Sequence, residues 1–191
     1  MRSSVESPRS VVEVIAETDR LILRNWRDED RADYIAACNT DAVTRFLGGP
    51  ATIEQIDAAL ERISRSQREH GFSFWALERR DDAAFLGYCG LKIVGDPEIA
   101  VKDDVESGWR LREDAWGQGY ASEAATACLD WAWAHLDVQR VVAMTTPANQ
   151  RSWRLMERIG MTRRRDLDFN HPQFAADHLL RRHITYVIER P

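Results

Sequence analysis

A turn with two glycines one residue apart is the feature that most restricts how this chain can fold. Residues 116–121 read Trp-Gly-Gln-Gly-Tyr-Ala and lie between an extended segment at 105–112 and an amphipathic helix that we expect to begin at about Ala121. Glycine permits a sharp turn and, lacking Cβ, lets a ligand approach the main-chain amides. The free N–H groups and the positive dipole end of the helix favour a phosphate there. Spacing alone leaves two interpretations open, a pyrophosphate site and an ordinary tight turn.

The residues around this turn argue against two common nucleotide-binding motifs. No Lys-Ser or Lys-Thr pair follows Gly119, as the nucleotide-triphosphate loop would require. The dinucleotide motif also fails, because no third glycine follows three residues later and the turn lies deep in the chain. The ligand must therefore be inferred from a longer stretch of sequence.

Over nine residues the turn resembles the acyl-CoA turn of the GNAT superfamily of N-acetyltransferases, in particular the branch that includes the Rim-type ribosomal-protein N-terminal acetyltransferases. That branch commonly has Trp-Gly-Lys-Gly-Tyr-Ala-Thr-Glu-Ala, and residues 116–124 here read Trp-Gly-Gln-Gly-Tyr-Ala-Ser-Glu-Ala. Trp116 departs from the wider superfamily, as it does in the branch. Gln118 replaces a usual basic residue, which removes one positive charge from near the pyrophosphate. The resemblance runs from about Glu17 to Glu189.

The resemblance implies an α/β fold of the α+β type, with a GNAT-like mixed, mostly antiparallel sheet of six to seven strands flanked by about four helices. A length of 191 residues suits one such domain. We assign the acetyltransferase domain to residues 17–191. Residues 1–16 are expected to form a mobile N-terminal arm with at most a short strand at Val11–Ile15.

Local patterns place the elements of this domain. Thr52 and Gln55 have the spacing of a capping box, which predicts a helix running to about His70. Gly87 and Gly90 lie within one strand and indicate a bulge or a close backbone approach. The remaining expected elements are a strand at Leu21–Arg24, a helix capped by Asp28, a hairpin of Phe72–Leu77 and Phe85–Val94, strands at Val105–Arg112 and Arg140–Thr145, a helix from Asn149 to Gly160, and closing strands at Met161–Asp166 and Arg182–Ile188.

Composition narrows the class of partner. The chain is 44% hydrophobic and 30% charged, with no secretory signal and no apolar run near the ~20 residues that span a bilayer, so we expect a cytoplasmic protein without a membrane partner. A net charge of −5 argues against nucleic acid as the main partner. Cys38, Cys89 and Cys128 are isolated and the histidines are scattered, so we expect core cysteines and no metal site.

The resemblance implies acetyl-CoA as the co-substrate. It also implies catalytic and binding roles for residues of the strand expected at Val105–Arg112, before the glycine turn. Glu106 holds the position of a general base that acts directly or through water; a solvated carboxylate paired with Arg110 is the alternative interpretation. Strand N–H groups around Trp109–Leu111 would hold the oxyanion. Main-chain groups of Leu111 and Arg112 would pair with the pantetheine amides, as an added strand does.

A second set of residues lies at the start of the helix after the last central strand. Asn149 and Ser152 have the Asn-x-x-Ser arrangement of the Rim-like branch, whose serine protonates the leaving thiolate; the alternative is a helix cap and a first-turn serine. Arg154 is expected either to meet the nucleotide end or to be an exposed helix arginine. The cofactor-binding residues implied are Trp109, Leu111, Arg112, Trp116, Gly117, Gln118, Gly119, Tyr120, Ala121, Asn149, Ser152 and Arg154.

The acceptor site is specified less sharply than the cofactor site. By resemblance the loop Asn39–Pro50 is a candidate substrate loop, with an ordinary helix connection as the alternative. Glu106, Trp75 and His171 are candidate substrate residues. His171 and His178 lie in the loop before the last strand, where a histidine can bind substrate, act as an alternative base, or simply be held by turn geometry.

These residues predict an enzyme that moves an acetyl group from acetyl-CoA to a primary amine by direct attack in a ternary complex. The acceptor is expected to be a protein N-terminus or a small molecule. A different class of function, a catalytically inactive CoA-binding regulatory or interaction protein, also fits the turn, and a purely structural domain would bind no CoA. A homodimer through the last strands or the tryptophan-bearing surface is a further expectation.

Overall fold

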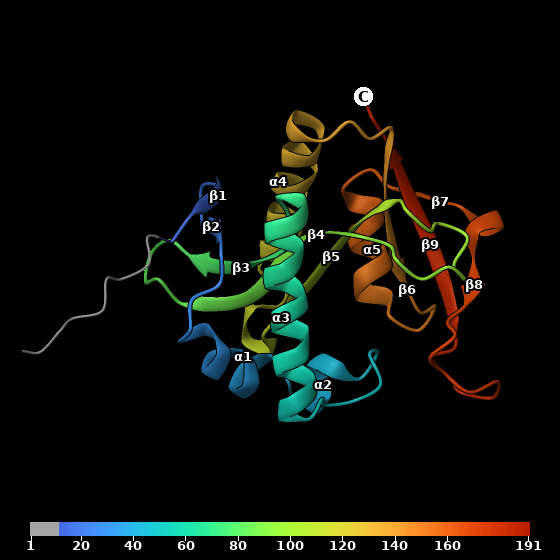
Figure 1. The fold of residues 1–191 in the computed structure, drawn as a ribbon, viewed down its shortest axis with the longest axis horizontal. Helices are drawn as coiled ribbons and strands as arrows, with labels where there is room; N and C mark the ends of the chain where they lie inside the picture. The colour runs from blue at the N-terminus through green and yellow to red at the C-terminus, as the bar shows by residue number, and fades with distance from the viewer. Residues whose placement is uncertain (1–11) are drawn as a thin grey trace, which may run out of the picture.

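A single sheet with helices on both faces makes up the protein in our computed structural model, which describes residues 12–191 (Figure 1). Over these residues the strands are β1 (Val14–Glu17), β2 (Leu21–Arg24), β3 (Phe74–Arg79), β4 (Phe85–Ile93), β5 (Val105–Leu111), β6 (Arg140–Thr145), β7 (Thr162–Arg163), β8 (Phe169–Asn170) and β9 (Arg182–Glu189). The α-helices are α1 (Asp30–Cys38), α2 (Asp41–Thr44), α3 (Ile53–His70), α4 (Tyr120–His135) and α5 (Gln150–Arg158). The predicted mixed α/β fold class is therefore confirmed, with short elements added.

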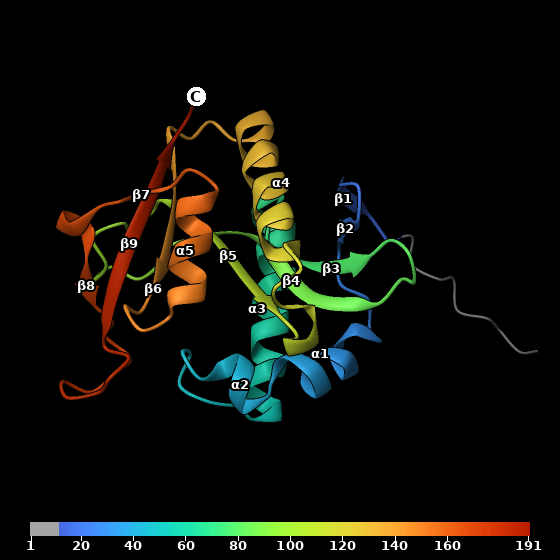
Figure 2. The same cartoon turned by 180° about the vertical axis from the view of Figure 1, so that it is seen from behind.

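The sheet follows the order β1-β2-β3-β4-β5-β6-β9-β7, and β8 also pairs with β9. Every pair is antiparallel except β5 with β6, which is parallel. Figures 1 and 2 show α3 in front of the sheet in one view and α4 in front in the other, so these helices cover opposite faces. None of the helices in residues 12–191 is long and apolar enough to cross a membrane.

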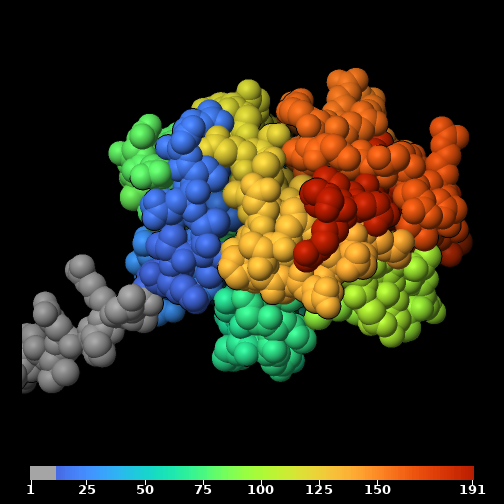
Figure 3. Space-filling model, turned by 90° about the horizontal axis from the view of Figure 1, so that it is seen from above, coloured from blue at the N-terminus to red at the C-terminus, as the bar shows by residue number. Residues whose placement is uncertain are grey.

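Small side chains let α4 pack closely on the central strands. Ala124, Ala125, Cys128 and Ala132 are all fully buried, and the Cys128 sulfur lies 3.6 Å from that of Cys89 on β4. This agrees with the prediction that the cysteines belong to the core. Seen from above, α4 lies between the N-terminal strands in blue and the C-terminal elements in orange and red (Figure 3).

The capping box predicted for α3 is present. The Thr52 hydroxyl accepts from the Gln55 N–H (3.3 Å), and the Gln55 side chain accepts from the Thr52 N–H (2.8 Å). In β4 the pairing with β3 shifts between Leu77 and Glu78, which is the bulge that Gly87 predicts. A Cβ added at Gly90 would lie 2.2 Å from the Ser73 carbonyl oxygen, so this glycine does allow a close backbone approach.

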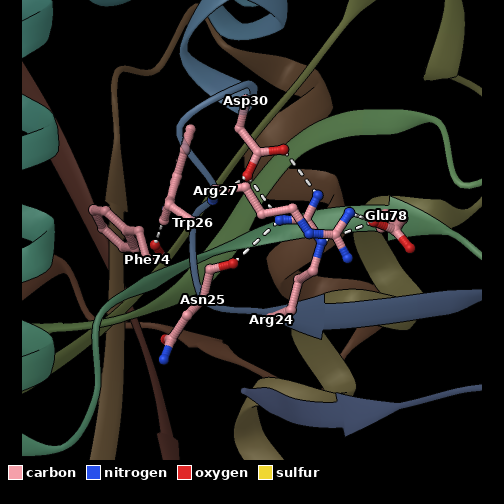
Figure 4. A network of polar contacts seen from close by, with 7 residues as sticks. All are labelled: Arg24, Asn25, Trp26, Arg27, Asp30, Phe74 and Glu78. Atoms are coloured by element: carbon pink, nitrogen blue, oxygen red, sulfur yellow. Dashed lines mark hydrogen bonds and ion pairs between the residues drawn. The ribbon is translucent and has the colours of Figure 1, made fainter. Parts of the chain in front are cut away.

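Asp28 does not cap α1, contrary to the sequence-based prediction. The helix begins after Glu29, whose side chain makes no capping bond. Instead, Asp30 is buried and binds the guanidinium of Arg24 with both oxygens (2.7 and 2.8 Å), while one of them also accepts from the Arg27 N–H (Figure 4). Arg24 also donates to Glu78 on β3 (2.8 Å). This network, rather than a local cap, fixes the start of α1 against the sheet.

Two predictions about strands near the chain ends need correction. Val11, where the short N-terminal strand was placed, and most of the predicted mobile arm lie outside the described residues; β1 starts at Val14 and pairs with β2, so the sheet takes in residues assigned to the arm. The strand predicted at Met161–Asp166 is only two residues long. It stops because the Asp168 carboxylate accepts from the Thr185 N–H (3.1 Å), which takes the place of further strand pairing.

Candidate functional site: a glycine turn beside an opened strand edge

The turn at residues 116–121 has a backbone that glycine favours. Gly117 and Gly119 have φ angles of 76° and 85°, in the left-handed region that side chains other than glycine rarely adopt. The Trp116 indole donates to the Leu111 carbonyl (2.9 Å), and the Gln118 amide donates to the Asp114 carbonyl (2.8 Å). These bonds hold the turn in one shape against the end of β5.

The N–H groups of this turn are free to bind an anion. The helix α4 begins at Tyr120, with Gly119 as its N-cap, and no side chain caps it. No acceptor among residues 12–191 takes the N–H groups of residues 117–122. Unpaired helix N-terminal amides at the positive dipole end form a favourable phosphate site. Gly117, Gln118, Gly119, Tyr120 and Ala121 thus present free N–H groups at this helix end, and their role in binding a cofactor stays a prediction.

Two arginines beside the turn were not predicted from the sequence. The Arg20 guanidinium donates to the Gln118 carbonyl (3.0 Å), pairs with Glu123 (2.5 Å) and lies over the Tyr120 ring. The Arg151 guanidinium lies 4.7 Å from the centre of the Trp116 ring. Together they bring positive charge to the turn, although residue 118 is glutamine.

Arg154 fits the second of its two interpretations, an exposed helix arginine. It is exposed, and its guanidinium is 5.4 Å from the Trp153 ring on the same helix. Arg151 is the α5 arginine that stacks on the turn, so Arg151 is better placed than Arg154 to meet a nucleotide there. No sequence pattern distinguishes these two arginines, which lie three residues apart on one helix.

Strands β5 and β6 separate after a short parallel contact. They pair only at Val105 with Val141 and at Glu106 with Val142, and then diverge (Figure 2). On its other edge β5 pairs with β4 continuously from Val105 to Leu111. The end of β5 nearest the glycine turn therefore has one paired edge and one open edge.

The register shows which residues face the opening. The Val94 N–H of β4 donates to the Asp104 carbonyl (2.9 Å), and the Arg112 N–H donates to the Leu86 carbonyl of β4 (2.9 Å). Backbone groups alternate between the two edges of a strand, so even-numbered residues of β5 bond to β4. Ser107 and Trp109 therefore direct their N–H and C=O groups into the opening, and Leu111 directs its N–H there, since its carbonyl already accepts from the Trp116 indole.

The prediction that the Arg112 main chain pairs with pantetheine is wrong. Its N–H is bound to Leu86, and its carbonyl accepts from the Ala115 N–H (3.1 Å). Its side chain pairs with Asp114 (2.6 Å) and donates to the Phe85 carbonyl (3.3 Å). Arg112 thus closes the end of β5 rather than lining the opening.

Two buried hydroxyls near the opening have no partner. The Ser107 Oγ on β5 and the Thr146 Oγ1 directly after β6 are inaccessible and make no hydrogen bond within the described residues. A buried hydroxyl without a partner is costly, which suggests that a bound molecule supplies one. Their positions, on the two strands that separate, fit a polar, chain-like ligand lying between them. Sequence patterns did not single out either residue.

Asn149 and Ser152 lie where β6 leads into α5. The Asn149 carbonyl accepts from the Ser152 N–H (3.1 Å), but its side chain donates to the Thr145 hydroxyl (3.0 Å) instead of capping the helix. Ser152 is half-buried, and no hydrogen bond engages its hydroxyl within residues 12–191. The pair thus lies at the start of α5, directly after β6, and the role of Ser152 stays a prediction.

Glu106 lies on the face of β5 that α1 and α3 cover. Its side chain is 12% exposed, and its carboxylate lies 2.9 Å from the Lys92 amine. This charge raises the pKa of Lys92 above its usual value. The alternative pairing with Arg110 is wrong, because Arg110 bonds to Tyr34. Glu106 therefore lies beside the Lys92 amine, next to the point where β5 and β6 part.

Trp75 cannot contact a substrate in this structure. It lies on the opposite face of β3, has no exposed surface, and packs with its ring centre 5.0 Å from that of Trp131 on α4. Its indole donates to the Gln67 side chain (2.9 Å). The tryptophan is a core residue, and the substrate prediction for it is corrected.

His171 lies within a cluster of aromatic rings beside the acceptor face. Its ring centre is 4.9 Å from that of His183 and 5.6 Å from that of Phe174. Burial lowers the pKa of His171 below its usual 6.5, while the Glu106 carboxylate is among the charges that raise it. The imidazole is therefore mainly neutral near pH 7.

The two loops assigned to the acceptor site meet in space. A Cβ added at Gly48 would lie 3.5 Å from the Phe174 ring, so the loop Asn39–Pro50 touches the loop that carries His171. His178 stacks on Phe174 with ring centres 4.7 Å apart. The two loops assigned to the acceptor site are therefore neighbours in the fold.

A comparison with models of known protein families identifies the family to which this chain belongs. Residues 20–162, more than half of the chain, match the model of the acetyltransferase (GNAT) domain. The chain belongs to the GNAT acetyltransferase family. Two curated relatives from Bacillus subtilis are 32% and 29% identical, over 75% and 76% of this chain and 83% and 81% of their own lengths. They are the uncharacterized protein YkkB and the uncharacterized N-acetyltransferase YoaA.

Solved GNAT structures share the fold. The ribosomal L7/L12 alpha-N-protein acetyltransferase RimL in complex with coenzyme A aligns with a TM-score of 0.72, covering 93% of this chain and 98% of its own. The spermidine N-acetyltransferase of Vibrio cholerae in complex with CoA and spermine aligns at 0.70, covering 91% and 97%. Both are 14% identical to this chain, so the likeness concerns the fold.

Proposed function

We propose that this GNAT acetyltransferase transfers an acetyl group from acetyl-CoA to the primary amine of an acceptor, by direct attack within a ternary complex. The observation that carries the proposal is the combination of an open β5 edge with a turn at its end whose N–H groups are free to bind phosphate. Coenzyme A has a diphosphate at one end and an amide-bearing arm that leads to the sulfur, which matches these two features in order. RimL and the Vibrio cholerae enzyme were both solved with CoA.

The residues present fit such a molecule. The N–H groups of residues 117–122 would hold the diphosphate, with Arg20 and Arg151 adding positive charge. The backbone N–H and C=O of Trp109 and the N–H of Leu111, which do not bond to β4, would pair with the amides of the arm. The unpartnered hydroxyls of Ser107 and Thr146 would gain bonds in the same channel.

Acetyl-CoA supplies an activated acyl group as a thioester, and the chain supplies three kinds of help. Glu106 takes the proton that the amine must lose, directly or through one water, so that the nitrogen lone pair can form the new C–N bond. A strand N–H at Trp109 stabilises the oxyanion. As the C–S bond breaks, Ser152 gives its proton to the thiolate and regains one from solvent. His171 is the alternative base, because burial keeps its imidazole mainly neutral near pH 7.

A thiol-release assay with acetyl-CoA against a panel of amines and N-terminal peptides tests the proposal. We expect free CoA to form with at least one class of amine. Ser152→Ala should lower turnover by about 10²-fold with the KM for acetyl-CoA nearly unchanged, which is typical of removing a general acid. Ser64→Ala on α3, on the opposite face of the sheet, is the matched control and should keep full activity.

Two outcomes would contradict the proposal in different ways. Acetyl-CoA binding in calorimetry without thiol release across the panel would favour the inactive CoA-binding protein. No binding at all would favour a structural domain. An unchanged rate in Ser152→Ala alone would remove only the role of that serine.

A further inference from the structure

Arg110 is a guanidinium without an acidic partner on the acceptor face of β5. It lies between the rings of Tyr34 and Tyr88, 5.7 and 5.5 Å from their centres, and donates to the Tyr34 hydroxyl. Its Nε is inaccessible and makes no hydrogen bond. No Asp or Glu oxygen of residues 12–191 lies within the 4.0 Å of an ion pair.

A comparison within the chain shows that this is unusual. Arg24, the buried arginine of β2, is held by two carboxylates at 2.7 to 2.8 Å (Figure 4). A largely buried cation without an anion is unfavourable, because desolvation is not offset by charge pairing. Arg24 has carboxylate partners within the fold and Arg110 has none among residues 12–191, which suggests that a ligand supplies the anion for Arg110.

The groups around Arg110 do not supply that anion themselves. Burial raises the pKa of the Tyr34 hydroxyl, and burial raises the pKa of the nearby Cys38 thiol to about 12. Both groups are therefore neutral at physiological pH. Of the acids that follow Arg110 along the chain, Glu113 is exposed and makes no ion pair within residues 12–191, and Asp114 is bound by Arg112.

The position of Arg110 relative to the chemistry is defined by β5. Glu106, Gly108 and Arg110 face the same side of the sheet, because side chains alternate along a strand. The Phe74 ring covers Gly108, since a Cβ there would be 3.0 Å from two of its atoms, and it stacks on Tyr88. The Cα atoms of Glu106 and Arg110 are about 13 Å apart along the strand. Their side chains therefore border one aromatic-lined region, with an anion at one end and a cation at the other.

We propose that Arg110 binds a carboxylate on the acceptor, so that the substrates are small amines that carry a carboxylate, such as free amino acids, rather than polyamines. This inference rests on the proposed acetyl transfer and adds the class of acceptor. A guanidinium forms two parallel hydrogen bonds to a carboxylate, which an amide or an ammonium group on the acceptor cannot reproduce. The amine of the same molecule would point toward Glu106.

The test compares L-amino acids with their amides, which differ only in the carboxylate, in the thiol-release assay. The amides should lose about 10- to 150-fold in kcat/KM, the range for a hydrogen bond to a charged group. Arg110→Gln should remove the preference for acids while the KM for acetyl-CoA stays near the wild-type value. Arg110→Lys keeps the positive charge but not the two parallel N–H donors of the guanidinium, so it should retain only part of the preference for acids over amides. Arg112→Gln is the control and should keep the preference.

A binding measurement separates failure of this inference from failure of acetyl transfer. N-acetyl-L-amino acids, the expected products, should raise the thermal midpoint of the wild-type protein more than their amides do, whether or not the enzyme turns over. Equal activity and equal stabilisation by acids and amides would overturn the inference. So would preferred use of spermidine, or of N-terminal peptides with blocked C-termini and no acidic side chain.

Discussion

Replacing Asp30 by asparagine removes one of the two carboxylates that hold the buried guanidinium of Arg24. Arg24 and Asp30 side chains are only 2% and 3% exposed, so solvent does not replace the lost charge. Although burial acts to lower the pKa of Arg24, the hydrogen bonds that it donates to Asp30 and Glu78 raise it, and the arginine remains charged. Glu78 cannot compensate, because it already accepts from Arg27 as well (2.8 Å).

The expected cost follows from this geometry. Breaking a buried ion pair by neutralising one partner costs about 3 to 5 kcal/mol, and the lower end applies because asparagine keeps a hydrogen-bond acceptor. For a chain of this size about 3 kcal/mol lowers the thermal midpoint by about 6 to 12 °C. Differential scanning calorimetry and urea unfolding would both measure it.

A second acid bound by arginine provides the control. Asp57 on α3 pairs with Arg31 on α1 (2.6 Å), and both side chains are well exposed, 50% and 42%. Exposed pairs contribute little, so Asp57→Asn should leave the midpoint close to that of the wild type. If the two variants were equally stable, burial of the Arg24 network would not be what fixes α1, and the reasoning would fail.

Three further predictions concern the turn and the histidines. Gly117→Ala should weaken CoA binding about tenfold in calorimetry, because an alanine strains the left-handed backbone. Gly71→Ala is the control: this glycine has a similar φ of 78° and equally open surroundings, so its replacement should destabilise the fold without changing the affinity for CoA. Arg151→Ala should raise the dissociation constant of CoA with a smaller effect at high salt, because its contribution is electrostatic. Burial lowers the pKa of His171 and of His183 below 6.5. The unfolded chain therefore binds more protons below pH 6.5, so the free energy of unfolding should be highest above pH 6.5 and fall as the pH drops below it. A thermal midpoint that rises on acidification from pH 7 to 5.5 would contradict this.

Features that depend on local sequence were predictable. The capping box of α3 and the bulge at Gly87 each follow from a few adjacent residues, and both are present. The glycine turn likewise needs φ values that only its own residues determine. These elements have signals within one strand, turn or helix end, where propensity and hydrogen bonding act over a few residues.

Features that depend on distant contacts were not predictable. Arg20 bonds to Gln118 across 98 positions, and no pattern links the two. The direction of the Arg112 backbone required the register of β5 against β4, which hydrophobic spacing does not give. Asp30 was missed because tertiary ion pairing overrode the local preference for a cap at Asp28. The unpaired state of Arg110 likewise emerges only when α1 is packed on β4 and β5.

The separation of β5 from β6 has a consequence for how the protein behaves in a crowded cell. An unpaired strand edge at the rim of a sheet invites other chains to add to it and aggregate. Here the edge lies in the middle of the sheet, flanked by β6 and lined by α4 and α5, so only a slender, extended molecule can reach it. The fold thereby keeps a template for hydrogen bonding available to a narrow carrier while denying it to the strands of neighbouring proteins.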